Sequence, residues 1–256
     1  MILPDLLDAA GKAARFQRIC DRAMTERRGR DGGIGTLAEK WQHQIVKRYL
    51  TENTDEHEVG VEGRRFVSDV RVGDHIYEVQ TGEFTPMAEK LAYYLEHTAC
   101  EVTVVHPIAK NRWVSRINPA TSEISPRKRS PRHGKAADLL PKLYPIRHLL
   151  HDPRLQFRIL LLEVHDFRLE NEKSRRAAPR FERIPLALLE DVTVNGRKDL
   201  QKLIPELPED SFTVKQFSAL TKLKGRDAYS AVKVLVAAGL VEQTEKIGRS
   251  MGFRKL

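Results

Sequence analysis

The sequence predicts an α/β protein with a mixed sheet, followed by a smaller domain built from short helices and strands. Three observations support this prediction: a hairpin-like stretch at 68–82, a buried apolar strand at 155–164, and two short helical segments after residue 213. With 256 residues, of which 41% are hydrophobic, the chain can bury a sizeable core and hold two domains.

The charge composition favours a polyanionic partner such as DNA. Lysine and arginine number 44 against 35 acidic residues, which gives a net charge of +9 and a pI near 9.6. Only Cys20 and Cys100 are present, too few for a disulfide framework or a cysteine-rich zinc site. The sequence has no long apolar run and no signal-peptide pattern, so we expect a cytoplasmic protein without membrane contact.

Residues 4–27 are expected to form an amphipathic helix that is broken by Asp31-Gly32-Gly33. This N-terminal segment, 1–33, is a candidate for packing on the core, for homodimer formation or for DNA contact, and the sequence leaves all three open. Its expected apolar positions are Leu6, Leu7, Ala10, Ala14, Ile19 and Met24.

The stretch from Ser68 to Gly82 brings two carboxylates together. Gly73-Asp74 suits a two-residue hairpin turn between two β-rich runs. Residues equidistant from this turn face each other, so Asp69 lies opposite Glu78 with Cβ atoms roughly 5 Å apart. Like charges in that arrangement destabilise a sheet, and a divalent cation bound by carboxylate oxygens would remove the penalty. Gln80 joins the same face, because side chains alternate along a strand.

The spacing of Asp69, Glu78 and Gln80 resembles the active-site signature of the PD-(D/E)XK nuclease superfamily, with Gln where most members have Lys. The expected elements follow the αβββαβ order of that superfamily's core: helix 36–50, strand 56–61, the hairpin, helix 86–97 with Thr85 as N-cap and Pro86 at its first position, and strand 102–106. The resemblance covers about residues 34 to 117 and implies a restriction-endonuclease-like fold.

The resemblance implies Mg²⁺- or Mn²⁺-dependent hydrolysis of DNA. Asp69 and Glu78 correspond to metal ligands, the backbone carbonyl of Val79 to an additional ligand, and Glu39 to an acidic ligand that archaeal Holliday-junction resolvases carry on the first helix. Gln80 would orient the attacking water or contact a phosphate. Lys90 resembles the lysine that some members have moved to the second helix.

Each candidate also has a structural alternative. Thr36 and Glu39 have the spacing of a capping box. Lys90 can be an exposed helix residue, and the carboxylate pair can be a solvated hairpin face beside Arg71. His106, at the end of an apolar strand, is expected to close that strand with a backbone bond rather than act as a general acid.

The region after this core is basic. A loop at 118–135 is predicted to grip phosphates, with an ordinary solvated charge run as the alternative. A helix at 136–150, the strand at 155–164 and a mobile basic loop between Arg168 and Arg183 complete a domain spanning 34–190. The cations of the phosphate-gripping loop are Arg127, Lys128, Arg129, Arg132 and Lys135.

The segment 197–256 has the order of helix, turn, helix and two strands that is typical of a winged helix-turn-helix domain. Thr213 is the expected N-cap of the first helix, Gly225 precedes the second helix and Gly239 ends it. The second helix of such domains commonly enters the DNA major groove, although winged helices also bind proteins. The candidate DNA contacts are Lys222, Lys224, Arg226, Tyr229, Lys246 and Arg249.

Two functions agree with these patterns. The first is a metal-dependent DNA endonuclease targeted by its winged helix. The second is a catalytically inactive, nuclease-fold regulator that binds DNA, which Gln80 in the usual lysine position supports. A structural adapter that uses the winged helix for protein contact is less consistent with the basic composition.

Overall fold

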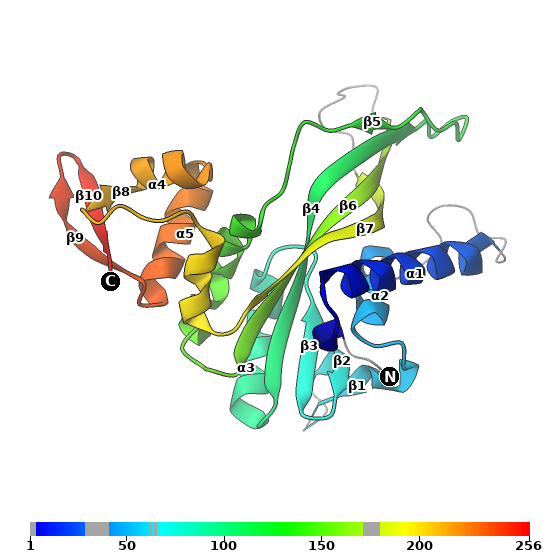
Figure 1. The fold of residues 1–256 in the computed structure, drawn as a ribbon, viewed down its shortest axis with the longest axis horizontal. Helices are drawn as coiled ribbons and strands as arrows, with labels where there is room; N and C mark the ends of the chain where they lie inside the picture. Colours follow the sequence, from blue (N-terminus) through cyan, green and yellow to red (C-terminus); the bar gives the residue numbers. More distant parts are fainter. Residues whose placement is uncertain (1–3, 29–40, 62, 64–65, 171–179) are drawn as a thin grey trace. The chain divides into compact units, whose positions relative to one another are not determined.

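The computed structural model describes residues 4–28, 41–61, 63, 66–170 and 180–256 (Figure 1). It divides into two discontinuous compact units. Unit 1 comprises residues 1–57, 107–135 and 159–192, and unit 2 comprises residues 58–106, 136–158 and 193–256. The domain boundaries expected from the sequence stay a prediction. In the described part of the chain, no helix has the length and apolarity needed to cross a membrane.

The protein is an α/β protein with one large mixed sheet. The strand order is β1-β2-β3-β4-β6-β7, with β5 paired to β4. β2 is antiparallel to β3, whereas β3 is parallel to β4. The strands are β1 (His57–Gly60), β2 (Val67–Val72), β3 (His75–Val79), β4 (Glu101–Ile117), β5 (Lys128–Arg129), β6 (Leu155–Leu169) and β7 (Arg180–Val194).

A helical crossover makes the parallel pairing of β3 and β4 possible. It consists of η4 (Thr85–Met87), a 3₁₀ turn, and α3 (Ala88–His97). The expected N-cap at Thr85 is wrong, because this residue lies inside the 3₁₀ turn and the capping positions, Phe84 and Met87, make no side-chain cap bond. Pro86 supports the turn instead, since its fixed φ suits the first residues of a helix.

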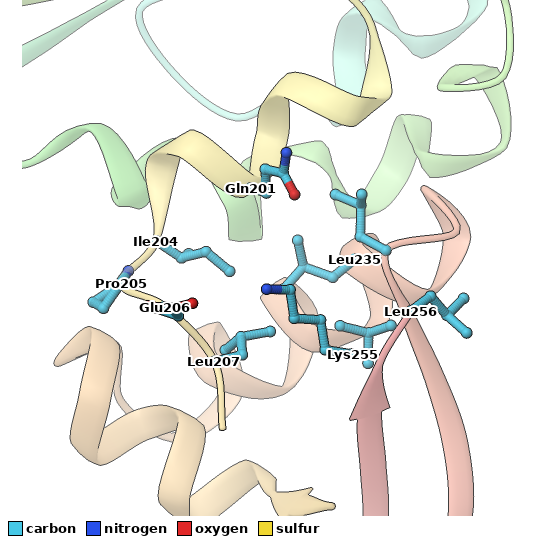
Figure 2. Close-up of a pocket in the computed structure, with 10 residues that line it drawn as sticks. Gln201, Ile204, Pro205, Glu206, Leu207, Leu235, Lys255 and Leu256 are labelled. Carbon is cyan, nitrogen blue, oxygen red and sulfur yellow. The ribbon is translucent and has the colours of Figure 1, made fainter. Parts of the chain in front are cut away.

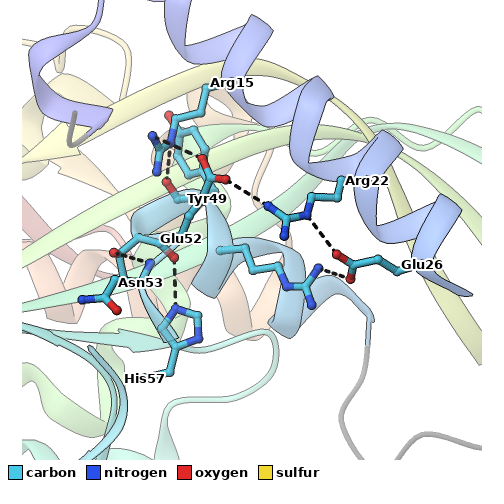
Figure 3. A network of polar contacts seen from close by, with 9 residues as sticks. Arg15, Arg22, Glu26, Tyr49, Glu52, Asn53 and His57 are labelled. Atoms are coloured by element: carbon cyan, nitrogen blue, oxygen red, sulfur yellow. Dashed lines mark hydrogen bonds and ion pairs between the residues drawn. The ribbon is translucent and has the colours of Figure 1, made fainter. Parts of the chain in front are cut away.

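Unit 1 contains η1 (Pro4–Leu6), α1 (Ala9–Arg28), α2 (Trp41–Leu50) and the 3₁₀ turn η2 (Thr54–Glu56). Phe16 of α1 packs edge-on against Tyr49 of α2, with ring centroids 5.4 Å apart. Arg15 Nε donates a hydrogen bond of 2.9 Å to the Tyr49 carbonyl, within the polar network that Figure 3 shows. Of the three roles left open for the N-terminal helix, packing is therefore observed.

The buried face of α1 differs from the expected one. Leu6, Ala10, Ala14 and Met24 are exposed, although each was expected on the apolar face. The aromatic anchor explains the difference, because the face centred on Phe16 is the one that turns toward α2. The buried apolar side chains follow helical spacing along this face and are Phe16, Ile19, Cys20 and Ala23.

Two further expectations need correction. The loop expected between Arg168 and Arg183 is wrong at both ends, because β6 continues to Leu169 and β7 begins at Arg180; residues 171–179 lie outside the described residues. The expected helix at 136–150 forms as the 3₁₀ helix η5 (Ala136–Leu149), which contains Pro141 and Pro145. Proline has no backbone N–H, which disfavours the α-helical hydrogen-bond ladder.

The C-terminal part of unit 2 begins with η6 (Arg197–Leu203). Thr213 forms the expected N-cap as a full capping box with Gln216. Gly239, with φ of +69°, follows the second helix as expected. The elements are β8 (Phe212–Thr213), α4 (Val214–Thr221), α5 (Gly225–Ala237), β9 (Val241–Ile247) and β10 (Ser250–Lys255), in an antiparallel sheet of order β8-β10-β9.

A cavity of about 280 Å³ lies in this C-terminal part, beside the chain that follows η6 (Figure 2). Its lining is largely aliphatic, with Leu207 and Leu235 on its walls and Lys255 and Glu206 as charged neighbours. None of the proposed metal ligands lines this cavity, so it gives no support to the carboxylate site described below.

Candidate functional site

The hairpin has the register that its turn predicts. Val72 pairs with His75 and Val70 with Tyr77, so residues equidistant from the turn face each other. Gly73 adopts φ of +57°, a left-handed conformation that glycine reaches without a steric penalty. The expected arrangement of the two strands is therefore confirmed.

The next residues in this register are Asp69 and Glu78. Asp69 Oδ2 accepts a hydrogen bond of 2.7 Å from the backbone N–H of Val79, so this carboxylate is bonded to the partner strand itself. Asp69 is half-buried and Glu78 is only 3% exposed. The charge of Asp69 contributes to a raised pKa of Glu78, because a nearby negative charge disfavours a second one.

Helix α3 supplies two partners to Glu78. Lys90 Nζ donates to Oε2 at 2.6 Å, and the Tyr94 hydroxyl donates to Oε1 at 2.9 Å. Burial is the largest cause of the Glu78 pKa shift to about 7, followed by Asp69, while Lys90 and Tyr94 oppose it. The exposed-helix alternative for Lys90 is wrong, because its ammonium group forms an ion pair with Glu78.

Tyr94 was missed by the sequence reasoning. The available signal was its position four residues after Lys90 on the same helix, because residues at this spacing share one helix face. Burial and the neighbouring Glu78 raise the pKa of Tyr94 above its ordinary value, so its hydroxyl remains a hydrogen-bond donor at neutral pH.

Gln80 directly follows β3, and His106 lies inside the neighbouring strand β4. Gln80 Oε1 accepts a hydrogen bond of 3.2 Å from the backbone N–H of Gly82. His106 Nδ1 donates to the Gln80 carbonyl, which is the backbone bond expected for this histidine. The expected strand end at His106 is wrong, because β4 continues through Pro107 to Ile117. Burial lowers the pKa of His106 to about 4, so the ring is neutral near pH 7.

The carboxylate pair suits a hard cation. Mg²⁺ takes oxygen ligands and often binds through one or two carboxylates together with water. Glu39 and Thr36 lie outside the described residues, so the choice between a metal ligand and a capping box stays open. Among the described residues, no group of three or more His, Cys, Asp or Glu side chains is arranged to hold a metal.

The predicted phosphate-gripping loop carries a short strand, β5, in unit 1. Lys128 pairs with Val114 and Arg129 with Trp113, which fixes this part of the loop along β4. The Arg127 guanidinium lies 4.8 Å from the centre of the Trp113 ring. Arg127, Lys128, Arg129 and Arg132 are exposed, whereas Lys135 is half-buried.

The six candidate DNA contacts of the C-terminal part are all exposed. Arg226 and Tyr229 lie in the first turns of α5, and the Tyr229 side chain is 47% exposed. Lys246 lies near the end of β9, and Arg249 lies in the turn between β9 and β10, where Gly248 has φ of +62°. The remaining two, Lys222 and Lys224, precede α5.

The comparison with known families places most of this structure in one domain. A sequence model described as "Domain of unknown function (DUF8091)" matches residues 40–195, more than half of the chain. The chain belongs to this family. The matched DUF8091 region contains the carboxylate pair, α3 and all the long strands, and it ends before η6. No curated protein and no solved structure matches the chain.

Proposed function

We propose that the protein is a metal-dependent DNA endonuclease with a PD-(D/E)XK-like DUF8091 domain and a DNA-binding winged helix. The single observation that carries this proposal is the arrangement of Asp69 and Glu78. They lie on adjacent strands directly beyond the paired hairpin residues, Asp69 accepts a hydrogen bond from the backbone N–H of the residue after Glu78, and Lys90 supplies a cation to Glu78.

The order and pairing of the elements support the fold part of the proposal. α2, β1, β2, β3, α3 and β4 follow one another as αβββαβ, with β2 antiparallel to β3 and β3 parallel to β4. The C-terminal elements β8, α4, α5, β9 and β10 have the order and antiparallel sheet expected of a winged helix.

The described side chains suggest distinct roles in hydrolysis. A divalent ion held by Asp69 and Glu78, with the Val79 carbonyl and Glu39 as further candidate ligands, would supply an activated water and positive charge. Tyr94 orients the Glu78 carboxylate through its hydrogen bond, and Lys90 stabilises the deprotonated form of Glu78 that a cation requires.

Lys90 also bears on the unusual Gln80. Gln80 is neutral and cannot offset negative charge developing on a phosphate, whereas an ammonium group can. Lys90 brings such a group to within 2.6 Å of the Glu78 carboxylate, so α3 provides the cation that the strand position lacks. Lys90 is therefore proposed as the substitute for the usual lysine.

Exposed cations provide the proposed DNA contacts. The loop cations Arg127, Lys128, Arg129 and Arg132 would neutralise backbone phosphates with no preference for sequence. Arg226 and Tyr229 of α5 would read a groove, as the second helix of a winged helix commonly does. Arg127, Lys128 and Arg129 can be replaced by Ala to test the loop. The slope of the logarithm of the DNA-binding constant against the logarithm of the salt concentration should then become shallower, by up to about 0.9 for each duplex phosphate that is no longer neutralised.

The deciding experiment is a cleavage assay on linear, branched and mismatched DNA with Mg²⁺ or Mn²⁺. We expect cleavage by the wild type and by Asp74→Asn, a control that alters an exposed carboxylate in the turn of the same hairpin. Glu78→Gln should abolish cleavage. Gln80→Lys, which restores the commoner signature, should preserve or increase it. Cleavage that persists in Glu78→Gln would refute the proposed site.

The second candidate function is a catalytically inactive regulator that binds DNA. Two observations favour it: Gln80 stands in the lysine position, and both oxygens of Glu78 already accept hydrogen bonds from α3. Absence of cleavage on every substrate, together with DNA binding that Arg226→Gln weakens, would establish this function instead.

A further inference from the structure

Asp166, on β6 in unit 1, is a fully buried carboxylate held by arginine. Arg183 from β7 binds it with two parallel hydrogen bonds, Nε to Oδ1 at 2.6 Å and Nη2 to Oδ2 at 2.9 Å. This bidentate geometry is the strong form of an arginine–carboxylate pair. It fixes the Arg183 guanidinium on the sheet.

Further arginines approach the same carboxylate without forming equivalent bonds. Arg112 Nε, from β4, lies 3.3 Å from Oδ2, but it has no hydrogen-bond partner among the described residues. Arg168 Nη2 lies 3.9 Å from the same oxygen. A guanidinium group has five N–H donors and a carboxylate has about four acceptor sites, so Asp166 cannot satisfy three arginines.

The local charge is strongly positive. Desolvation by burial lowers the pKa of both Arg112 and Arg180, and repulsion from Arg183 and Arg168 lowers them further. Arg132 also repels Arg112. Glu182 is the second carboxylate that interacts with this group. Among the described residues, the charges that act on Arg112 and Arg180 thus come from more arginines than carboxylates.

We propose that this arginine cluster, Arg112, Arg168 and Arg183 around Asp166 with Arg132 and Arg180 as further charged neighbours, is a binding site for phosphoryl groups. Guanidinium groups bind phosphate oxygens in the same bidentate manner as carboxylates. The Asp166–Arg183 pair holds the cluster in place, while the Arg112 and Arg168 side chains remain 20% and 30% exposed and can reach a ligand.

The site shares Arg132 with the DNA-contacting loop of the proposed function, but its other arginines have no role in the proposed cleavage reaction. It uses residues of unit 1, whereas Asp69 and Glu78 belong to unit 2. Its ligand is a phosphate group, which either a nucleic-acid backbone or a free phosphate compound can provide. Both sources present phosphate oxygens to the arginines. They differ in that an oligonucleotide presents many phosphates in a row, whereas a free phosphate compound does not.

The test compares wild-type protein with Arg112→Gln/Arg168→Gln. These substitutions remove two incompletely bonded cations and leave the Asp166–Arg183 pair in place. Arg132→Gln is the milder second variant, because Arg132 is exposed and surface substitutions usually change stability little. Arg22→Gln is the matched control, since Arg22 is an exposed arginine of α1 that pairs with Glu26.

The first arm measures binding of sodium pyrophosphate by calorimetry and by the shift in melting temperature, at constant ionic strength. We expect wild type and Arg22→Gln to bind equally. The double variant should lose about tenfold or more in affinity, as expected when bidentate charge-assisted bonds are removed. Arg132→Gln should lose less.

The second arm measures binding of a single-stranded and a duplex oligonucleotide. Weaker binding of either oligonucleotide by the double variant assigns the site to nucleic-acid phosphates. A change in pyrophosphate affinity alone assigns it to a free phosphate compound. Equal affinities of wild type and both cluster variants for every probe overturn the proposal. Asp69→Asn should retain pyrophosphate binding, so this result is independent of cleavage.

Discussion

Glu78 in unit 2 and Asp166 in unit 1 are both buried carboxylates, but their surroundings differ in sign. Glu78 has one cation, Lys90, and a second carboxylate, Asp69, as its charged neighbours. Among the described residues, Asp166 lies near more arginines than carboxylates. The difference in local charge, rather than burial alone, is the basis for proposing different ligands. The first site is proposed to bind a cation and the second an anion.

Burying an unpaired carboxylate raises the free energy of the folded state, and the two sites reduce this penalty in different ways. Glu78, with a pKa of about 7, can accept a proton near neutral pH. Asp166 is instead matched by the guanidinium group of Arg183. We therefore expect the Glu78 site to respond to pH and the Asp166 site to respond to loss of an arginine.

The largest effect on stability is expected from Arg183→Gln. This substitution removes both bidentate bonds to a fully buried carboxylate, which should destabilise the fold by about 3–4 kcal/mol, the lower part of the range for a broken buried ion pair, because Arg112 remains close. Urea unfolding at pH 7 measures the effect. The exposed-pair control Arg22→Gln should cost less than about 1 kcal/mol. Equal costs would show that the Asp166 pair is not special.

The second prediction concerns the pH dependence caused by Glu78. Its pKa is raised from 4.5 to about 7, so between these values the folded protein holds a proton that the unfolded chain has released. Stability from this group is therefore full below about pH 4.5 and falls as the pH rises to 7. The loss amounts to about 3 kcal/mol, at 1.36 kcal/mol per pKa unit.

Glu78→Gln should remove this pH dependence. Chemical unfolding of wild type and variant at pH 5 and pH 8 measures it, and the variant should gain stability relative to wild type at pH 8. Parallel pH profiles would mean that Glu78 is ionised throughout, and the contrast with Asp166 would disappear.

The third prediction tests whether the hairpin site, Asp69 and Glu78, binds a cation. Asp69→Asn should weaken Mn²⁺ binding at least about 100-fold, since loss of supporting residues around metal sites alone costs 10–100-fold. Isothermal titration calorimetry measures the affinity, with Asp74→Asn as the control from the same hairpin. Wild-type affinity should also rise with pH up to about 7, because Glu78 must lose its proton to bind a cation. A pH-independent affinity would place the ion elsewhere.

The hairpin site could be predicted from the sequence because its geometry is local. The turn Gly73-Asp74 fixes the pairing of β2 and β3 as far as Val70 and Tyr77, and Asp69 and Glu78 come directly beyond that pair. The backbone bond of His106 was also expected, but the strand end on which that expectation rested is wrong, because β4 continues to Ile117. Local turn chemistry was therefore sufficient for the hairpin, whereas the length of β4 was not predictable from local rules.

The arginine cluster could not be predicted in the same way. Arg112 lies on β4, well before Asp166 on β6 and Arg183 on β7, and only the pairing of these strands in the sheet brings the three residues together. The charged residues near the start of β7 also concealed that strand, so this region was expected to be a loop. The bond from Tyr94 to Glu78 depends in the same way on how α3 packs beside the hairpin.

The smallest expected effect comes from Lys90→Gln, and its pH dependence distinguishes the two sites most sharply. At pH 6, Glu78 in the folded protein is largely protonated, so removal of its cation should cost less than about 1 kcal/mol. At pH 8 the cost should rise by roughly 1–2 kcal/mol, because the carboxylate must then bind a proton above its pKa or stay buried without its cation. Arg183→Gln should cost the same at both values, because its effect comes from the two hydrogen bonds that it removes. Urea unfolding of wild type and both variants at pH 6 and pH 8 measures the loss in free energy of unfolding for each variant at each pH. If Lys90→Gln lost the same free energy at both pH values, Glu78 would be ionised and paired with Lys90 throughout. It would then hold no proton that a metal ion could replace.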